Sequence, residues 1–249
     1  MAALDIDEKS LSYPIPLDTS MYSPEGAFYP AGYQKMVMRV FEEHLERIGM
    51  DVPRLIKAYG VSWVLLAMSL EITRPLSPAM QLSATTWHTS DALPLFRREI
   101  ALKDESGAEV AVGTTFSALF DVHTRRICHD AALLQNFMLP DGETRIEAKS
   151  QFATDADFTF VEERRVRPSF IDGVGHVNNM RYGEFVYDAL TSEERGRMAK
   201  LSRLDVYFTA ELKPDTSFVM ERAEEGESVI VRGRILPSGK QAFLMRLSF

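Results

Sequence analysis

The feature that most constrains the fold of this chain is a plan that occurs twice: one amphipathic helix followed by several strand-like segments. The first helix is predicted to begin at Pro30, because proline suits the first turn of a helix, and to end at Gly49. Its buried face is marked by apolar residues at helical spacing, namely Tyr33, Met36, Val37, Val40, Phe41, Leu45 and Ile48. Strands are predicted to follow at residues 63–73, 80–89, 95–103 and 109–120, with a hairpin turn at residues 104–107.

The same order returns in the second part of the chain. A helix predicted near residues 178–190 is followed by strands at residues 201–210, 216–222, 228–236 and 241–249. One such unit leaves its helix and its sheet edge partly uncovered, so two units gain by pairing. The predicted fold is therefore α+β, with two tandem units that each wrap an antiparallel sheet around a central helix. The units are residues 10–139 and 158–249, joined by a linker at residues 140–157.

Composition and charge exclude several other classes of protein. The 249 residues carry a net charge of −8, which argues against nucleic-acid binding because no large basic face is available. No apolar run approaches the roughly 18 residues of a membrane span, and residues 1–9 resemble no targeting signal, so a cytoplasmic location without a membrane span is predicted.

Cysteine and histidine usage narrows the chemistry further. Cys128 is the only cysteine, which leaves no intramolecular disulfide and no cysteine-based metal cluster. It precedes His129, but a lone cysteine more often packs as a small apolar residue than acts as a nucleophile. The five histidines show no metal-ligand spacing, so no metal site is predicted.

Residues 172–182 carry the strongest candidate for chemistry. An arginine-rich segment at residues 164–170, predicted as a strand, leads into Asp172, a glycine-containing turn and His176. A helix then opens at a pair of asparagines, where free backbone N–H groups and the positive end of the helix dipole can hold negative charge. An acid or base beside such an oxyanion site is what acyl transfer requires. The alternative is a plain helix cap, with Asn178 as the N-cap and His176 as an ordinary turn residue.

The string Asp-x-x-Gly-His-Val-Asn-Asn-x-x-Tyr at residues 172–182 resembles the signature of hotdog-fold thioesterases, above all the acyl-acyl-carrier-protein (acyl-ACP) thioesterases. Residues 208–211, with Asp215, are similar to the strand of that family that carries a catalytic glutamate. Segments of the first unit also follow the family in order, at residues 63–72, 86–87, 96–98, 114–119 and 124–126. The resemblance extends from Tyr13 to the C-terminus, and several spaced matches in one order are more specific than one motif.

The resemblance implies a thioester hydrolase with a tandem hotdog architecture, which releases free fatty acid from acyl-ACP and so ends fatty acid chain elongation. It implies three catalytic residues, Asp172, His176 and Glu211. One of the two carboxylates would act as base or nucleophile, and His176 would act as orienter and proton carrier. No metal or organic cofactor is implied.

The site is predicted once rather than twice. Residues 22–28, which precede the first helix, hold no Asp/His pair, whereas residues 172–178 do. The backbone N–H groups of Val177 and Asn178 would hold the oxyanion, with Asn179 at the same helix mouth. The first unit would then supply a hydrophobic tunnel, in which an acyl chain gains roughly 0.8 kcal/mol per buried CH₂ group.

Two departures from the family pattern leave alternatives open. Val174 stands where the family usually has an asparagine, and Leu212 stands where plant members have a cysteine. The loss of the asparagine side chain keeps open a catalytically impaired acyl-binding protein, and an acyl-CoA thioesterase on the same scaffold is the alternative enzyme. A hotdog dehydratase is less favoured, because it would need a His/carboxylate pair contributed across two subunits.

The expected partner is an acyl carrier protein that bears the fatty acyl thioester. An acidic carrier would need a local basic patch on this acidic chain, and Arg164, Arg165 and Arg181 are the candidates for that patch. Arg125 and Arg126 could extend it. The alternative is an ordinary solvated strand edge. A homodimer is the assembly considered, although no residue in the sequence selects it.

Overall fold

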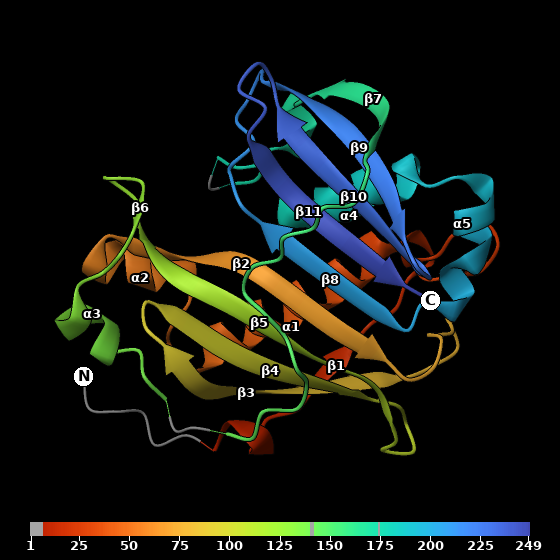
Figure 1. The fold of residues 1–249 in the computed structure, drawn as a ribbon. Helices are drawn as coiled ribbons and strands as arrows, with labels where there is room; N and C mark the ends of the chain where they lie inside the picture. The colour runs from red at the N-terminus through yellow and green to blue at the C-terminus, as the bar shows by residue number, and fades with distance from the viewer. Residues whose placement is uncertain (1–6, 140–141, 174) are drawn as a thin grey trace.

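The computed structural model describes residues 7–139, 142–173 and 175–249 of the chain. Its strands are β1 (Tyr13–Ile15), β2 (Val61–Ile72), β3 (Leu82–Ala92), β4 (Leu95–Lys103), β5 (Glu109–Asp121), β6 (Arg126–Ile127), β7 (Thr159–Arg165), β8 (Arg203–Phe208), β9 (Ser217–Glu225), β10 (Ser228–Ile235) and β11 (Gln241–Ser248). Together they form one eleven-stranded sheet in the order β1-β3-β4-β5-β2-β8-β11-β10-β9-β7, with β6 paired to β5 (Figure 1).

The α-helices of the described residues are α1 (Pro30–Arg47), α2 (Val52–Tyr59), α3 (Ala131–Gln135), α4 (Asn179–Ala189) and α5 (Ser192–Arg197). Short 3₁₀ turns lie at Glu8–Ser10, Thr19–Met21, Pro168–Phe170 and Met198–Lys200. Figure 1 shows α1 and α4 on the same face of the curved sheet. The predicted α+β fold, with a helix wrapped by antiparallel strands in each part of the chain, is confirmed.

The two parts of the chain join through their sheets. Strands β2 and β8 pair antiparallel in the register that runs from Ala67 opposite Tyr207 to Glu71 opposite Arg203. An ion pair reinforces the junction, because Nη1 of Arg203 lies 2.8 Å from Oε1 of Glu71. The hydrogen-bond ladder therefore continues from one unit into the other.

The two central helices touch at a glycine. Gly183 of α4 lies so close to α1 that an added Cβ atom would come within 2.4 Å of the backbone nitrogen of Ala31. The neighbouring Gln34 donates from Nε2 to the carbonyl of Asn179 at 2.9 Å. The first turn of α4, which opens the candidate site, is thus fixed against α1.

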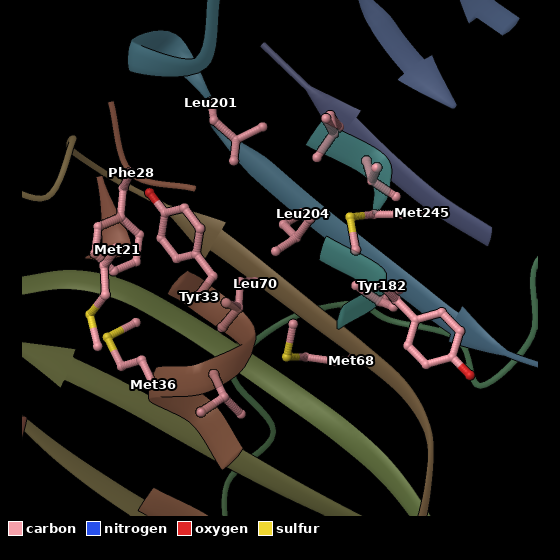
Figure 2. Close-up of a cluster of buried hydrophobic side chains, with 14 of the residues drawn as sticks. Met21, Phe28, Tyr33, Met36, Met68, Leu70, Tyr182, Leu201, Leu204 and Met245 are labelled. Carbon is pink, nitrogen blue, oxygen red and sulfur yellow. The ribbon is translucent and has the colours of Figure 1, made fainter. Parts of the chain in front are cut away.

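One hydrophobic core lies between the helices and the sheet. Figure 2 shows side chains from both parts of the chain in this cluster. The labelled residues are Met21, Phe28, Tyr33, Met36, Met68, Leu70, Tyr182, Leu201, Leu204 and Met245. Because both units contribute to the same buried cluster, removing either one would expose apolar surface of the other.

The opposite face of the sheet is crossed by residues 142–158, most of which form the predicted linker (Figure 1). Arginines of the sheet hold its backbone: Arg97 donates to the carbonyl of Ile146 at 2.7 Å, and Arg203 donates to that of Glu147 at 2.8 Å. Farther along, the ring of Phe152 stacks on Tyr207 of β8. The connection is therefore bound to the sheet.

The N-terminal segment is anchored by a buried polar cluster. The carboxylate of Glu8 accepts a hydrogen bond from Nε2 of His44 on α1 at 2.7 Å and one from the backbone N–H of His88 at 2.7 Å. It also forms an ion pair with Arg98 of β4. The other ring nitrogen of His44 accepts from the hydroxyl of Tyr13 at 2.7 Å. All polar atoms of the His44 ring are thus satisfied inside the protein.

Two local expectations need correction. Only the first two residues of the segment 164–170 lie in a strand: β7 ends at Arg165, and Pro168 begins a 3₁₀ turn, because proline has no N–H to donate to a strand ladder. Helix α2 was not expected. The side chain of Asp51 caps it by accepting from the backbone N–H of Arg54 at 3.1 Å, and Gly60 ends it in the left-handed conformation.

Candidate active site

A tight loop presents His176 just before α4. The backbone N–H of Asp172 donates to the carbonyl of His176 at 2.9 Å, and that of Gly175 donates to the carbonyl of Asp172 at 3.1 Å. Gly175 has a φ of +84°, a left-handed conformation that glycine adopts at little cost. Ile171 and Val177 form an antiparallel bridge that closes the base of the loop. The predicted turn between Asp172 and His176 is therefore present.

Asn178 caps the N-terminus of α4. Its Oδ1 atom accepts from the backbone N–H of Met180 at 3.0 Å, which is the N-cap role considered from the sequence. Its own backbone N–H donates to the carbonyl of Phe170 at 2.8 Å. The oxyanion role of Asn178 stays a prediction, and in this structure its N–H is engaged by Phe170. Val177 and Asn179 stay candidates, since their N–H groups have no acceptor among the described residues.

Glu211 reaches His176 from the segment that follows β8. The backbone N–H groups of Thr209 and Ala210 both donate to the carbonyl of Ala242, at 2.8 and 3.0 Å, which ends the regular pairing of β8 with β11. Beyond this point, Oε1 of Glu211 lies 3.2 Å from Nε2 of His176. The structure thus brings these two predicted residues together at the mouth of α4.

Tyr182, the last residue of the motif, fixes the Glu211 segment from within the core. Its hydroxyl is hydrogen-bonded to the backbone of Leu212, and its ring packs edge-on against Phe208 at 5.2 Å between centroids. Burial raises the pKa of Tyr182, so its hydroxyl stays protonated at neutral pH. The motif tyrosine therefore positions the glutamate rather than carrying charge.

Arg125 completes a cluster with His176 and Glu211. The sequence analysis had placed Arg125 only in an extension of the basic patch. It lies in the loop between β5 and β6, and its Nη2 atom donates to Oε1 of Glu211 at 2.6 Å and to Nε2 of His176 at 2.8 Å. The triplet Thr124-Arg125-Arg126, one of the matches to the family, was the signal that could have assigned it to the site.

The contacts of this cluster define how the ring of His176 can be protonated. A guanidinium group only donates, so the Nε2 atom that faces Arg125 must present its lone pair, and the neutral ring carries its proton on Nδ1. If Nε2 takes up a proton, that proton lies within hydrogen-bond range of Glu211. His176 and Glu211 can therefore share a proton that arrives at Nε2.

Asp172 contacts His176 through the backbone. Its Oδ1 atom accepts from the backbone N–H of His176 at 3.3 Å, which helps to close the loop. The residue also lines the large cavity onto which this cluster opens, called the main cavity below. Its predicted catalytic role stays a prediction, and the contact with His176 gives it a positioning function in the loop. Val174, the departure from the family pattern, lies outside the described residues.

The cluster opens onto a cavity of about 1060 Å³. Its walls come from both units: Asp172, His176, Val177, Asn178, Asn179 and Glu211 from the second, and Met38, Leu45, Val52, Trp63, Leu65 and Phe120 from the first. A smaller cavity of about 150 Å³ shares Trp63 and Leu65 with it and is closed by Phe41, Phe96 and Phe137. Apolar space of the first unit therefore continues from the cluster.

Glu42 is the acidic residue of α1 that faces both cavities. Burial among the apolar walls raises the pKa of its carboxyl group. An apolar chain in this space would lie against a carboxyl that is easier to protonate than an ordinary glutamate.

The three arginines predicted to bind a carrier all form ion pairs within the chain. Arg164 pairs with Glu162 at 2.6 Å and with Asp188 at 3.0 Å. Arg165 pairs with Asp215 at 3.0 Å, and Arg181 pairs with Glu184 at 2.6 Å; these pairs offset the local positive charge. The carrier-binding role of these arginines stays a prediction.

Other residues considered from the sequence lie outside this cluster. Cys128 is half-buried and packs against a cluster that includes Leu119 and Phe137. No group of three or more His, Cys, Asp or Glu side chains suited to a metal ion occurs in the part of the chain that the structure describes. Within the same residues, no helix is long and apolar enough to span a membrane.

Two family models match the chain. The model of the acyl-ACP thioesterase N-terminal domain matches residues 33–132, and that of the C-terminal domain matches residues 153–246. The chain belongs to the acyl-ACP thioesterase family. It is a thioester hydrolase, and its family supports the hydrolysis of fatty acyl-ACP.

Solved structures of acyl-ACP thioesterases share the fold of this one along almost its whole length. An acyl-ACP thioesterase from Bacteroides thetaiotaomicron is 18% identical, with a TM-score of 0.83 over 98% of this chain and 100% of that chain. The 12:0-ACP thioesterase from Umbellularia californica is 15% identical, with a TM-score of 0.78 over 96% of each chain. A comparison with curated proteins finds no match. The resemblance to hotdog-fold thioesterases predicted from the sequence is confirmed.

Proposed function

We propose that the protein releases free fatty acid from acyl-ACP by a site built from His176, Glu211 and the N-terminus of α4, and so ends fatty acid elongation. The observation that carries this proposal is the distance of 3.2 Å between Nε2 of His176 and Oε1 of Glu211 at the wall of a cavity of about 1060 Å³. A base beside an apolar cavity matches a substrate that has one reactive carbonyl and a long hydrocarbon chain.

The two units would divide the work. Residues 10–139 would hold the acyl chain, because Trp63, Leu65 and Phe96 line the apolar end of the space. Residues 158–249 would perform the chemistry, and residues 140–157 would connect them. The carbonyl carbon of the thioester would then lie near Glu211, with the hydrocarbon chain pointing away from the second unit.

Hydrolysis would proceed by attack of water. Glu211 takes a proton from the water as its oxygen bonds to the carbonyl carbon, and the negative charge on the carbonyl oxygen is held by N–H groups at the N-terminus of α4. Val177 and Asn179 are the donors proposed there. Glu211 then passes this proton to Nε2 of His176, 3.2 Å away. When the carbon–sulfur bond breaks, His176 gives the proton to the leaving thiolate, so fatty acid and free thiol are the products and both residues return to their starting forms. Asp172 would keep the His176 loop closed.

A hydrolysis assay with matched acyl-ACP and acyl-CoA series tests the proposal. Turnover of acyl-ACP at a higher kcat/KM than acyl-CoA is the expected result. Binding of acyl chains without turnover of either series would identify an acyl-binding protein instead. The cytoplasmic location and a homodimeric state stay predictions.

The three arginines predicted to bind a carrier form ion pairs with acidic residues of the chain. These ion pairs favour a second function, that of an acyl-CoA thioesterase. Because Arg164, Arg165 and Arg181 are all engaged by acidic neighbours, the surface holds less free positive charge for an acidic carrier. Equal or higher kcat/KM with acyl-CoA in the same assay would select this activity.

A further inference from the structure

We propose that Arg125 is a positioning residue, supplied by the first unit, that holds His176 and Glu211 of the second unit in the arrangement the reaction needs. This inference rests on the proposed function. The two N–H bonds of one nitrogen, Nη2, serve the two groups: Glu211 at 2.6 Å and His176 at 2.8 Å. Arg125 thus ties together a base and a proton carrier that come from different segments of the chain.

The loop that carries Arg125 is built to present it. Oδ1 of Asp121 accepts from the backbone N–H groups of His123 and Thr124 at 2.9 and 2.7 Å, and the N–H of Arg125 donates to the carbonyl of Asp121 at 2.9 Å. Arg125 itself has a φ of +55°, in the left-handed region that residues other than glycine rarely adopt. Such a conformation persists only where the surroundings impose it, and it occurs preferentially at functional sites.

An aromatic ring supports the same geometry. The guanidinium of Arg125 lies over Phe120 at 5.7 Å from the ring centroid, and the His176 ring meets Phe120 edge-on at 6.4 Å. Phe120 is the second-to-last residue of β5, so one strand end supports both the arginine and the histidine. All three side chains line the main cavity.

The chemical effect of Arg125 is on the tautomer of His176. With Arg125 in place, Nε2 faces a donor and keeps its lone pair, which is the form that can accept a proton beside Glu211. Without Arg125, the neutral ring can place its proton on Nε2 and donate it to Glu211, 3.2 Å away. That arrangement removes the accepting nitrogen and occupies the base, so both partners lose their roles.

Kinetics of three variants of the full chain test this inference. Arg125→Ala should lower kcat for acyl-ACP by on the order of 10- to 100-fold, the scale of a displaced catalytic group, and change KM less than about twofold. Arg125→Lys should recover part of kcat, because an ammonium can still donate to both acceptors. Arg39→Ala is the matched control: Arg39 is an exposed arginine of α1 that does not line the main cavity, so its kcat should equal that of the wild type.

Histidine ¹⁵N NMR gives a readout that does not depend on turnover, with His176→Ala identifying the signal. The wild type should show the ring of His176 protonated on Nδ1, and Arg125→Ala should shift it toward the Nε2-protonated form. If the wild type hydrolyses no thioester, the proposed function fails, while the tautomer measurement still decides the contact.

Three outcomes would overturn the role of Arg125. An unchanged kcat with an unchanged tautomer would make the contact an ordinary ion pair. A higher kcat in Arg125→Ala would mean that the arginine blocks the site. A rise in KM for acyl-ACP alone, with kcat intact, would make it a contact for the carrier.

Discussion

The molecule contains two clusters made of the same three residue types, histidine, glutamate and arginine, and they differ chiefly in access to solvent. In the first, His44 and Glu8 are 0% and 5% exposed and are joined by Arg98. In the second, His176 and Glu211 are 31% and 28% exposed and are joined by Arg125.

The ring contacts of the two histidines explain what each cluster can do. His44 has both ring nitrogens engaged, one with Tyr13 and one with Glu8, so no position is left for a substrate or a water molecule. His176 lines a large cavity, and both His176 and Glu211 accept from one donor atom, Nη2 of Arg125. Residue type alone therefore does not define a site in this protein. A cluster becomes chemically useful when one of its atoms faces open space.

Removal of the exposed histidine should have the largest effect on activity. His176→Ala should lower the rate of thioester hydrolysis by about 10² to 10⁴, the range of general acid–base catalysis, and leave the unfolding temperature nearly unchanged. His129→Ala is the matched control, since His129 is exposed and outside the cavity wall. Steady-state kinetics and thermal unfolding measure the two effects. Wild-type turnover in His176→Ala would remove the proposed site.

Removing the buried glutamate should have the opposite result. Glu8→Ala leaves Arg98, His44 and the N–H of His88 without their acceptor, so the free energy of unfolding should fall by about 3 to 5 kcal/mol. The kcat of the molecules that remain folded should change little. Urea denaturation checks this, with the exposed neighbour Asp7→Ala as control. A loss of kcat without a loss of stability would place the buried cluster in the chemistry.

Acid should distinguish the two clusters as well. Burial alone would raise the pKa of Glu8, but the hydrogen bond from His44 and the charge of Arg98 outweigh it and lower that pKa to about 2. A carboxyl group whose pKa is lowered by folding stabilises the folded state at pH values above its unfolded pKa of 4.5. This contribution to the free energy of unfolding is lost as the pH falls from 4.5 toward 2. The amount is about 3 kcal/mol.

His44 adds to this effect, because burial lowers its pKa and the unfolded chain takes up that proton first. Urea unfolding at pH values between 7 and 3 should therefore show a steep acid loss in the wild type and a flatter one in Glu8→Gln. Parallel curves for the two proteins would contradict the assignment of the acid loss to Glu8.

The smallest expected effect concerns exposed pairs. Arg181→Glu breaks the pair with Glu184, but exposed pairs contribute about 0 to 1 kcal/mol, so stability should hardly change. If Arg181 binds an acidic carrier, KM for acyl-ACP should rise by about fivefold at most, and the rise should shrink with added salt. A short neutral thioester serves as the control substrate. Equal changes for both substrates would make Arg181 an ordinary surface charge.

The parts of the fold that the sequence could predict are those with local signals. Helix α1 and its apolar face follow from periodicity and from Pro30, and the hairpin strands follow from alternating residues between turns. His176 and Glu211 were predicted from a motif and a family position. Their meeting depended on how β8 ends at Ala242, which no local signal contains.

The parts that could not be predicted depend on contacts between distant residues or on which backbone N–H groups are hydrogen-bonded in the folded chain. Glu8 and His44 lie in different segments and belong to no motif, so only the folded sheet brings them together. In the sequence, Arg125 is one basic residue among several. Only the folded β5–β6 loop brings its side chain into contact with His176. The contact between the N–H of Asn178 and the carbonyl of Phe170 forms only when the loop closes, so no local signal in the sequence contains it.

The continuity of the sheet through β2 and β8 has a consequence for how such a protein can change over evolutionary time. In an assembly of two identical copies, every substitution appears twice, and a change that improves one position is imposed on its symmetry mate. A single chain with two linked units is released from that constraint. In this chain, residues 22–28 accordingly hold no Asp/His pair, while residues 172–178 hold one. A cluster that draws Arg125 from one unit and His176 from the other is an asymmetric solution that the linked chain permits.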